Sequence, residues 1–173
     1  YGAANPTLST TKTGLVNGDT GADAFTDQLT TTAVQTSSVG TYGIQAANLA
    51  SPVGYQVDLV DGGEGSFRVD PAPLTITADD KTKVYGAGVP PLTRTISGFV
   101  LGEGESVITG GLPSTGAGVA SGVGNYAIAI DPATADNYLI TTAPGSLDVT
   151  RAPLTVVVDN KTRLEGTANP PFT

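Results

Sequence analysis

The chain repeats itself, and this repetition constrains its fold more than any other feature of the sequence. Tyr-Gly-Ala-Ala-Asn-Pro at the start returns as Tyr-Gly-Ala-Gly-Val-Pro and again as Glu-Gly-Thr-Ala-Asn-Pro. The copies lie roughly 80 residues apart, a spacing typical of small modules joined in tandem. Such an array favours length, spacing and display over catalysis. The positions that define the structural motif are Tyr1, Gly2, Pro6, Tyr85, Gly86, Pro90, Gly166 and Pro170.

The internal similarity extends along most of the chain and predicts where modules begin. Ala-Pro-Leu-Thr occurs at 72–75 and at 152–155, each time after a short β-like stretch. Proline cannot donate a hydrogen bond to a sheet ladder, so it suits the start of a domain. We therefore predict a repeat lacking its first strand at 1–72, a complete repeat at 73–152, and the first strand or strands of a third repeat at 153–173.

The composition excludes several classes of function. The chain contains no cysteine, histidine, methionine or tryptophan, which excludes disulfides and zinc–thiolate sites and removes the commonest general base. Its net charge is −8 and it has no basic patch, so nucleic acid and anionic membranes are poor partners. No apolar run approaches the roughly 20 residues of a membrane-spanning helix. We predict no enzyme, no cofactor, no nucleic-acid partner and no membrane insertion.

The pattern of the complete repeat predicts a mainly β fold. Apolar and hydroxyl residues alternate over 74–78, which indicates a half-buried strand. Further strands are expected over 92–97, 123–130, 138–142 and 146–150, and Glu103–Thr109 is expected to form a short helix. This order predicts tandem small β-rich domains of β-grasp type, with strands plus one short helix per repeat. Without the helix, the alternative is an immunoglobulin-like β-sandwich.

Two groups of acidic residues are weak candidates for calcium, the hard cation that carboxylates bind. Asp79 and Asp80 stand at a strand break, and the second group surrounds a Gly-Gly hairpin tip at Asp58, Asp61 and Glu64. Neither group has the spacing of an EF-hand or of a nonapeptide calcium repeat. Turn chemistry explains both groups better, because aspartate side chains bond to local backbone in turns. We therefore predict no metal site.

Lys12 is unusual because it occupies the place that Ile96 holds in the second copy, on the core face of an expected strand. A buried lysine must be paired or neutralised, and an isopeptide bond to an asparagine is one way to do this. The sequence offers no convincing asparagine partner. A lysine whose amine reaches solvent from an edge strand is the preferred interpretation.

These motifs resemble a known family of repeats. Leu-Thr-x-x-x-Asp-(Asp/Asn)-Lys-Thr-(Lys/Arg)-x-x-Gly, followed by Val-Gly-Asn-Tyr-Ala-Ile and Asn-Tyr-Leu-Ile, is similar to MBG/YDG repeat domains. The resemblance implies export to the bacterial cell surface, in large secreted adhesins of filamentous-haemagglutinin type. It carries no catalytic residues. Glu165 departs from the tyrosine of the motif, so that aromatic residue is not required in every copy.

The predicted function is a structural repeat module that acts as spacer or stalk in an extracellular bacterial adhesin or filament. Its expected partners are neighbouring repeats of the same chain, or copies of itself that exchange strands in a fibre. The alternative is a module that binds a surface glycan or a receptor protein. Such a module would use the loops that vary between the two copies, Asp61–Glu64 and Gly116–Gly122.

Overall fold

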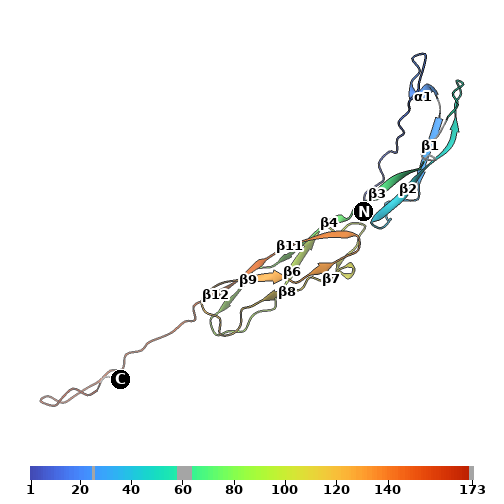
Figure 1. Cartoon of the computed structure of the whole chain (residues 1–173). Coiled ribbons are helices and arrows are strands. Elements are labelled where there is room, and N and C mark those ends of the chain that lie inside the picture. The colour runs from blue at the N-terminus through green and yellow to red at the C-terminus, as the bar shows by residue number, and fades with distance from the viewer. Residues whose placement is uncertain (25, 58–63, 172–173) are drawn as a thin grey trace.

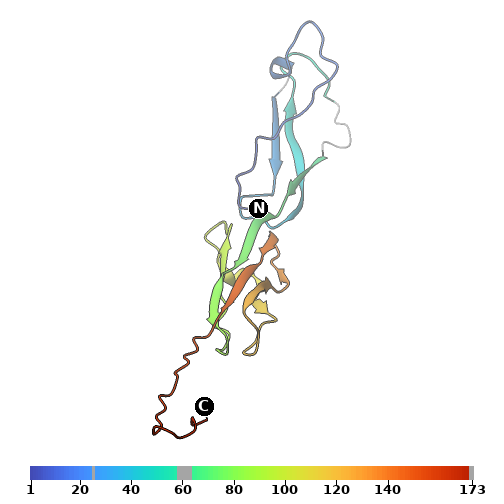
Figure 2. The ribbon, with the colours of Figure 1, turned by 90° about the vertical axis from the view of Figure 1, so that its left-hand side faces the viewer.

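The computed structural model describes residues 1–24, 26–57 and 64–171, and it shows two β-rich modules in line (Figure 1). The N-terminus lies where the modules meet, and residues 151–171 leave the far end of the second module without forming a strand (Figure 2). The first module contains α1 (Gly21–Ala24), β1 (Thr26–Thr31), β2 (Gly40–Ala50) and β3 (Glu64–Val69). Its strands form one antiparallel sheet in the order β1-β2-β3.

The second module contains two main sheets and a short two-stranded one. The first main sheet has the order β11-β4-β6, the second has the order β5-β12-β9-β8, and β10 pairs with β7. The strands are β4 (Ala72–Ala78), β5 (Lys81–Val84), β6 (Arg94–Ser97), β7 (Thr109–Gly110), β8 (Pro113–Thr115), β9 (Gly124–Ile130), β10 (Ala133–Thr134), β11 (Tyr138–Ala143) and β12 (Gly145–Thr150). The predicted mainly β fold is confirmed.

Two long parallel strands form the centre of the second module. β4 and β5 follow each other with a break at Asp79–Asp80, and β11 and β12 follow each other with a break at Pro144. β11 pairs parallel with β4, and β12 pairs parallel with β5, with the same residue offset on both sides of the break. The pair therefore passes from one sheet to the other in one register. The first strands of the module, β4 and β5, thus pair in parallel with its last strands, β11 and β12, as in a β-grasp fold. This differs from the antiparallel sheets of an immunoglobulin sandwich.

The crossover between the two halves of the module is shorter than the sequence pattern predicts. Over Glu103–Thr109 the structure has one three-residue 3-10 turn, η2 (Glu105–Val107). Gly104 before it is extended, with φ −147°, and makes no side-chain cap, and Ile108 after it is extended again. Glycine has a low helix propensity, and the extended Gly104 keeps the helix from including the residues before Glu105, so the segment makes a single tight turn and then joins β7.

The core follows from the alternation of residues on β4. Leu74, Ile76 and Ala78 are buried, whereas Thr75 between them is exposed. Ile128 of β9 and Leu147 of β12 face Ala78 in one core cluster, and Tyr138 packs against Leu74 in the other. Period-two burial places every second residue of a strand in the core. The core thus runs the length of the parallel pair.

Gly145 lets the two long strands stay close at their break. A Cβ atom at this position would lie 2.5 Å from the carbonyl oxygen of Ala78. Asp80 bridges the same break, because its Oδ1 accepts hydrogen bonds from the Ser146 amide at 2.7 Å and the Ser146 hydroxyl at 3.1 Å. A carboxylate thus replaces the ladder bond that the break removes.

Candidate functional site: the junction between the modules

A short connection joins the two modules. β3 ends at Val69 and β4 begins at Ala72, and both end residues are buried. Only Asp70 and Pro71 lie between them, and the Ala72 amide donates to the carbonyl of Asn137 at 3.0 Å. Proline fixes its own φ angle and stiffens a linker. The chain therefore crosses the junction with few rotatable bonds.

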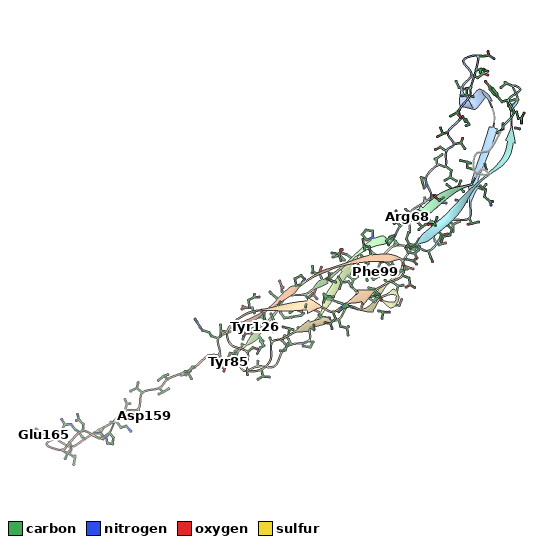
Figure 3. The ribbon with its side chains drawn as sticks, viewed as in Figure 1. Arg68, Tyr85, Phe99, Tyr126, Asp159 and Glu165 are labelled. Carbon is green, nitrogen blue, oxygen red and sulfur yellow. The ribbon has the colours of Figure 1, made fainter. Side chains whose placement is uncertain are left out.

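Tyr1 of the first module packs into the second module at this junction. Its ring meets the Tyr138 ring edge-on at 5.8 Å between centroids, and Tyr138 meets Phe99 in the same way at 6.0 Å. Edge-to-face pairs of this kind are favoured by the charge distribution of aromatic rings. Figure 3 places Phe99 at the end of the second module that faces the first. Three aromatic rings from distant parts of the sequence thus form one cluster around Tyr138.

Glu103 connects the two tyrosine hydroxyls. The Tyr1 hydroxyl donates to Glu103 Oε1 at 2.8 Å, and the Tyr138 hydroxyl donates to Glu103 Oε2. The Val100 amide donates to the Tyr138 hydroxyl at 3.2 Å. Hydrogen bonds to a carboxylate are stronger than those between neutral groups. We refer to Phe99, Val100, Glu103 and Tyr138 as the tyrosine socket.

Gly2 lets the turn that carries Tyr1 approach this socket. Its φ is +78°, and a Cβ atom at this position would lie 2.6 Å from Val100 Cγ2. Glycine is the residue that adopts positive φ without steric cost. Gln35 of the first module holds the turn in place, since its side-chain amide donates to the Gly2 carbonyl at 2.8 Å. We refer to Tyr1 and Gly2, and to their copies, as the Tyr-Gly turn.

A second bridge joins the modules beside the socket. The Val39 amide of the first module donates to Asn137 Oδ1 of the second at 3.0 Å. The main-chain nitrogen of Tyr1 donates to the Asp70 carbonyl at 2.5 Å, which ties the turn to the connection itself. The junction therefore combines aromatic packing with polar contacts on more than one segment.

The socket favours the neutral form of both tyrosines. The pKa of Tyr1 is raised above its ordinary value, first by the hydrogen bond to Glu103 and then by burial. The pKa of Tyr138 is raised first by burial and then by its bond to Glu103. A phenolate in either place would lie beside the Glu103 carboxylate, and like charges at this distance repel.

This environment predicts that the junction is weakened by alkali. A pKa raised in the folded state stabilises that state fully below the unfolded value of about 10, and the contribution is lost as pH rises through the raised value. Glu103→Gln is expected to lower the pKa of Tyr1 and Tyr138 and shift part of the phenolate absorbance to lower pH. Tyr42→Phe serves as control, because the Tyr42 hydroxyl donates elsewhere, to the Ser38 carbonyl. An unchanged titration curve for Glu103→Gln would contradict the assignment.

The motif residues form the same turn in all three copies. Gly2, Gly86 and Gly166 have φ of +78°, +83° and +79°. A basic side chain two residues before the tyrosine position supports the two later copies: Lys83 Nζ donates to the Ala87 carbonyl at 2.9 Å, and Arg163 Nη1 donates to the Thr167 carbonyl at 3.0 Å. Pro6, Pro90 and Pro170 follow the turns. The tandem motif is therefore a recurring backbone structure.

The acidic candidates lie at strand ends. Asp79 Oδ1 accepts the Thr95 hydroxyl at 2.9 Å, Asp79 Oδ2 accepts the Thr93 hydroxyl, and Asp80 binds Ser146 as described above. Asp58 and Asp61 lie outside the described residues, and Glu64 is the first residue of β3. Within the described residues, no cluster of three acidic side chains is placed to hold a metal ion. Asp79 and Asp80 thus bond to neighbouring strands, and the local backbone bonds that the turn interpretation predicts are not the contacts described for them.

The lowered pKa of Asp79 predicts that the protein loses stability in acid. Hydrogen bonds from Thr93 and Thr95, followed by the charge of Lys81, lower the pKa of Asp79. The contribution of a group with a lowered folded pKa is present above the unfolded value of about 4 and is lost as pH falls through the folded value. Asp79→Asn is expected to flatten the fall in melting temperature below pH ~4. Asp148→Asn, on the exposed side of β12, is the control; equal flattening in both variants would refute the assignment.

Lys12 and the variable loop lie away from the junction cluster. Lys12 is partly buried and lines a groove with Leu8, Ser9 and Leu29. Ser9 and Lys12 have the Ser-x-x-Lys spacing of some serine enzymes, but residues 1–16 form no helix that would place them on one face. The loop 116–122 contains a turn in which the Gly118 amide donates to the Ser121 hydroxyl at 2.9 Å.

Sequence reasoning missed Phe99, Glu103 and Asn137 as functional positions. They lie about a hundred residues from Tyr1 in the sequence, and the junction brings them together. A signal was present, because an acidic residue and a tyrosine recur at matching positions of both copies, as Asp19 with Tyr55 and Glu103 with Tyr138. Paired recurrence of an acid and a hydroxyl indicates a contact.

Comparison with known proteins supports the repeat assignment. The family model of the MBG domain (YGX type) matches residues 1–63 and again residues 74–148. Neither the curated proteins nor the solved structures gave a significant match. No helix among the described residues is long and apolar enough to cross a membrane. The MBG repeat family is not an enzyme family, and its domains are typical of surface proteins. The chain, with two matched copies that share the Tyr-Gly turn, belongs to the MBG domain family of the YGX type.

Proposed function

We propose that this chain is a structural segment of an extracellular bacterial adhesin or filament, in which successive MBG modules form a stalk. The observation that carries the proposal is the junction, where Tyr1 of one module enters the tyrosine socket of the next. A connection of two residues, aromatic packing and hydrogen bonds together restrict how the modules turn against each other. A stalk needs this property, because it must hold its distal end away from the surface.

The charge and shape of the chain support the same function. The net charge of −8 keeps copies soluble and makes separate chains repel at long range. The modules lie end to end, so each module adds its full length to the molecule (Figure 1). The immediate partners in this proposal are the neighbouring modules of the same chain.

Small-angle X-ray scattering of the whole chain tests the proposal. We expect an elongated particle whose profile fits one relative orientation of the modules. The reference is a variant with the four residues Gly-Ser-Gly-Ser inserted between Asp70 and Pro71, since such linkers behave as flexible coils. If the natural chain scatters like this reference, as two freely tumbling modules, the stalk function is wrong.

A further inference from the structure

The parallel pair of the second module, β4–β5 with β11–β12, lies along the path of the chain. The chain enters the module at the start of β4 and leaves it at the end of β12. β4 begins beside the junction, and residues 151–171 leave from the opposite end of the module (Figure 2). A pull on the chain from both sides therefore draws the two long strands past each other, along their own length.

Such a pull acts on the whole ladder between the two strands at once. β11 pairs with β4 over six residue pairs, and β12 pairs with β5 over four, in one register. The hydrogen bonds of a parallel ladder are evenly spaced, so a force along the strands is shared among them. A force across the strands, applied at one end, would instead open the bonds one after another. The ladder therefore resists sliding better than peeling.

The ladder is extended at both ends and bridged at its break. The first amide of β4 donates to the Asn137 carbonyl at 3.0 Å, and the Tyr85 amide donates to the Thr150 carbonyl at 2.8 Å. At the break, Asp80 Oδ1 accepts hydrogen bonds from the amide and the hydroxyl of Ser146. The bonds between the two long strands thus continue from the point where the chain enters the module to the point where it leaves.

The core also opposes a slide of the two strands. Leu74 and Ile76 of β4 and Leu147 and Val149 of β12 are fully buried. A register shift of one residue would turn these side chains from the core toward the other face of the sheet. In addition, β4 lies between β11 and β6, and β12 lies between β5 and β9, so each strand is held by ladders on both sides.

We propose that the second module bears tension along the chain, and that the parallel pair is the element that resists it. The proposal rests on the proposed stalk function, because a stalk under pull transmits the force through every module in line. The lifetime of a module under force is governed by its rate of unfolding rather than by its equilibrium stability. The direction of the pull relative to the parallel pair therefore decides how long the module survives.

Single-molecule force spectroscopy of the whole chain in two directions tests this proposal. The chain has no cysteine, so two introduced cysteines define where the force acts. Asp70→Cys with Arg151→Cys pulls along the chain, whereas Asp70→Cys with Asp136→Cys pulls across the start of the pair, just before β4 and β11. All three positions are exposed. At the same force, we expect the module to last at least about tenfold longer along the chain, since several ladder bonds must break together.

Equal lifetimes in the two directions, or a longer lifetime across the pair, would overturn the tension-bearing proposal. The stalk function would not fall with it, because a stiff arrangement of modules can still unfold at low force. Scattering from the whole chain would decide that function separately.

Asp80→Ala tests the bridge at the break of the pair. It removes two hydrogen bonds to a carboxylate and is expected to shorten the lifetime along the chain about tenfold. The lifetime across the pair should change little, because peeling begins at the far end of β4 and β11. Asp148→Ala, on the exposed side of β12, is the matched control and should behave like the wild type in both directions. An equal loss in both directions for Asp80→Ala would show a general loss of stability and would contradict its place in the tension-bearing element.

Discussion

Ile76→Ala is expected to destabilise the second module by about 2–5 kcal/mol, the usual cost of truncating a fully buried aliphatic side chain. Ile76 is 0% exposed and lies on β4, the central strand of its sheet, between Thr142 of β11 and Ile96 of β6. The surrounding strands are held by their ladders and cannot close over the cavity. Urea unfolding followed by circular dichroism measures the loss.

The matched control for this substitution lies one residue away. Thr75→Ala removes atoms from the same strand, but Thr75 is exposed on its outer face, so the expected change is within ~0.5 kcal/mol. A loss for Ile76→Ala no larger than that for Thr75→Ala would mean that β4 is not the core strand of the module. The assignment of the parallel pair would then be wrong.

The second large effect is expected at the junction. Tyr1→Glu gives the first turn the residue that the third turn carries at Glu165. The new carboxylate would face Glu103, so aromatic packing and a hydrogen bond to a carboxylate are replaced by repulsion. We expect the docked population of the junction to fall at least about tenfold. Amide hydrogen exchange at Val39, whose amide donates to Asn137 across the junction, reports this directly.

The sequence supplies its own control for this experiment. Tyr85→Glu makes the same change at the second turn, whose side chain is exposed at the far end of the second module. Exchange at Val39 should then stay as in the wild type. Equal acceleration in both variants would show a general loss of stability, and unchanged exchange in Tyr1→Glu would show that Tyr1 does not hold the modules together.

The strands could be predicted from the sequence because their signal is local. Alternation over Leu74–Ala78 and the glycine and proline positions mark the strands and turns of the complete repeat, and β4, β9, β11 and β12 lie close to where the pattern puts them. The short helix predicted over Glu103–Thr109 does not form as an α-helix. Gly104 lowers helix propensity and η2 remains a single 3-10 turn.

The junction could not be predicted, because its contacts depend on tertiary placement. Nothing in the residues around Tyr1 indicates that its hydroxyl reaches Glu103 or that its ring meets Tyr138. The motif alone identified Tyr1 and Gly2 as recurring positions, which fits either a core or an interface role. Only the structure shows that the glycine is needed for close approach to Val100.

The distance distribution between the two modules shows whether the Tyr-Gly turn fixes their relative orientation. The chain has no cysteine, so spin labels on Thr41→Cys and Thr82→Cys, at exposed positions of the first and second modules, would report that distance alone. We expect one narrow distribution in the otherwise natural sequence and a broad one when Tyr1→Glu is added. A distribution that is broad in both proteins, or equally narrow in both, would contradict the claim that the Tyr-Gly turn locks successive modules.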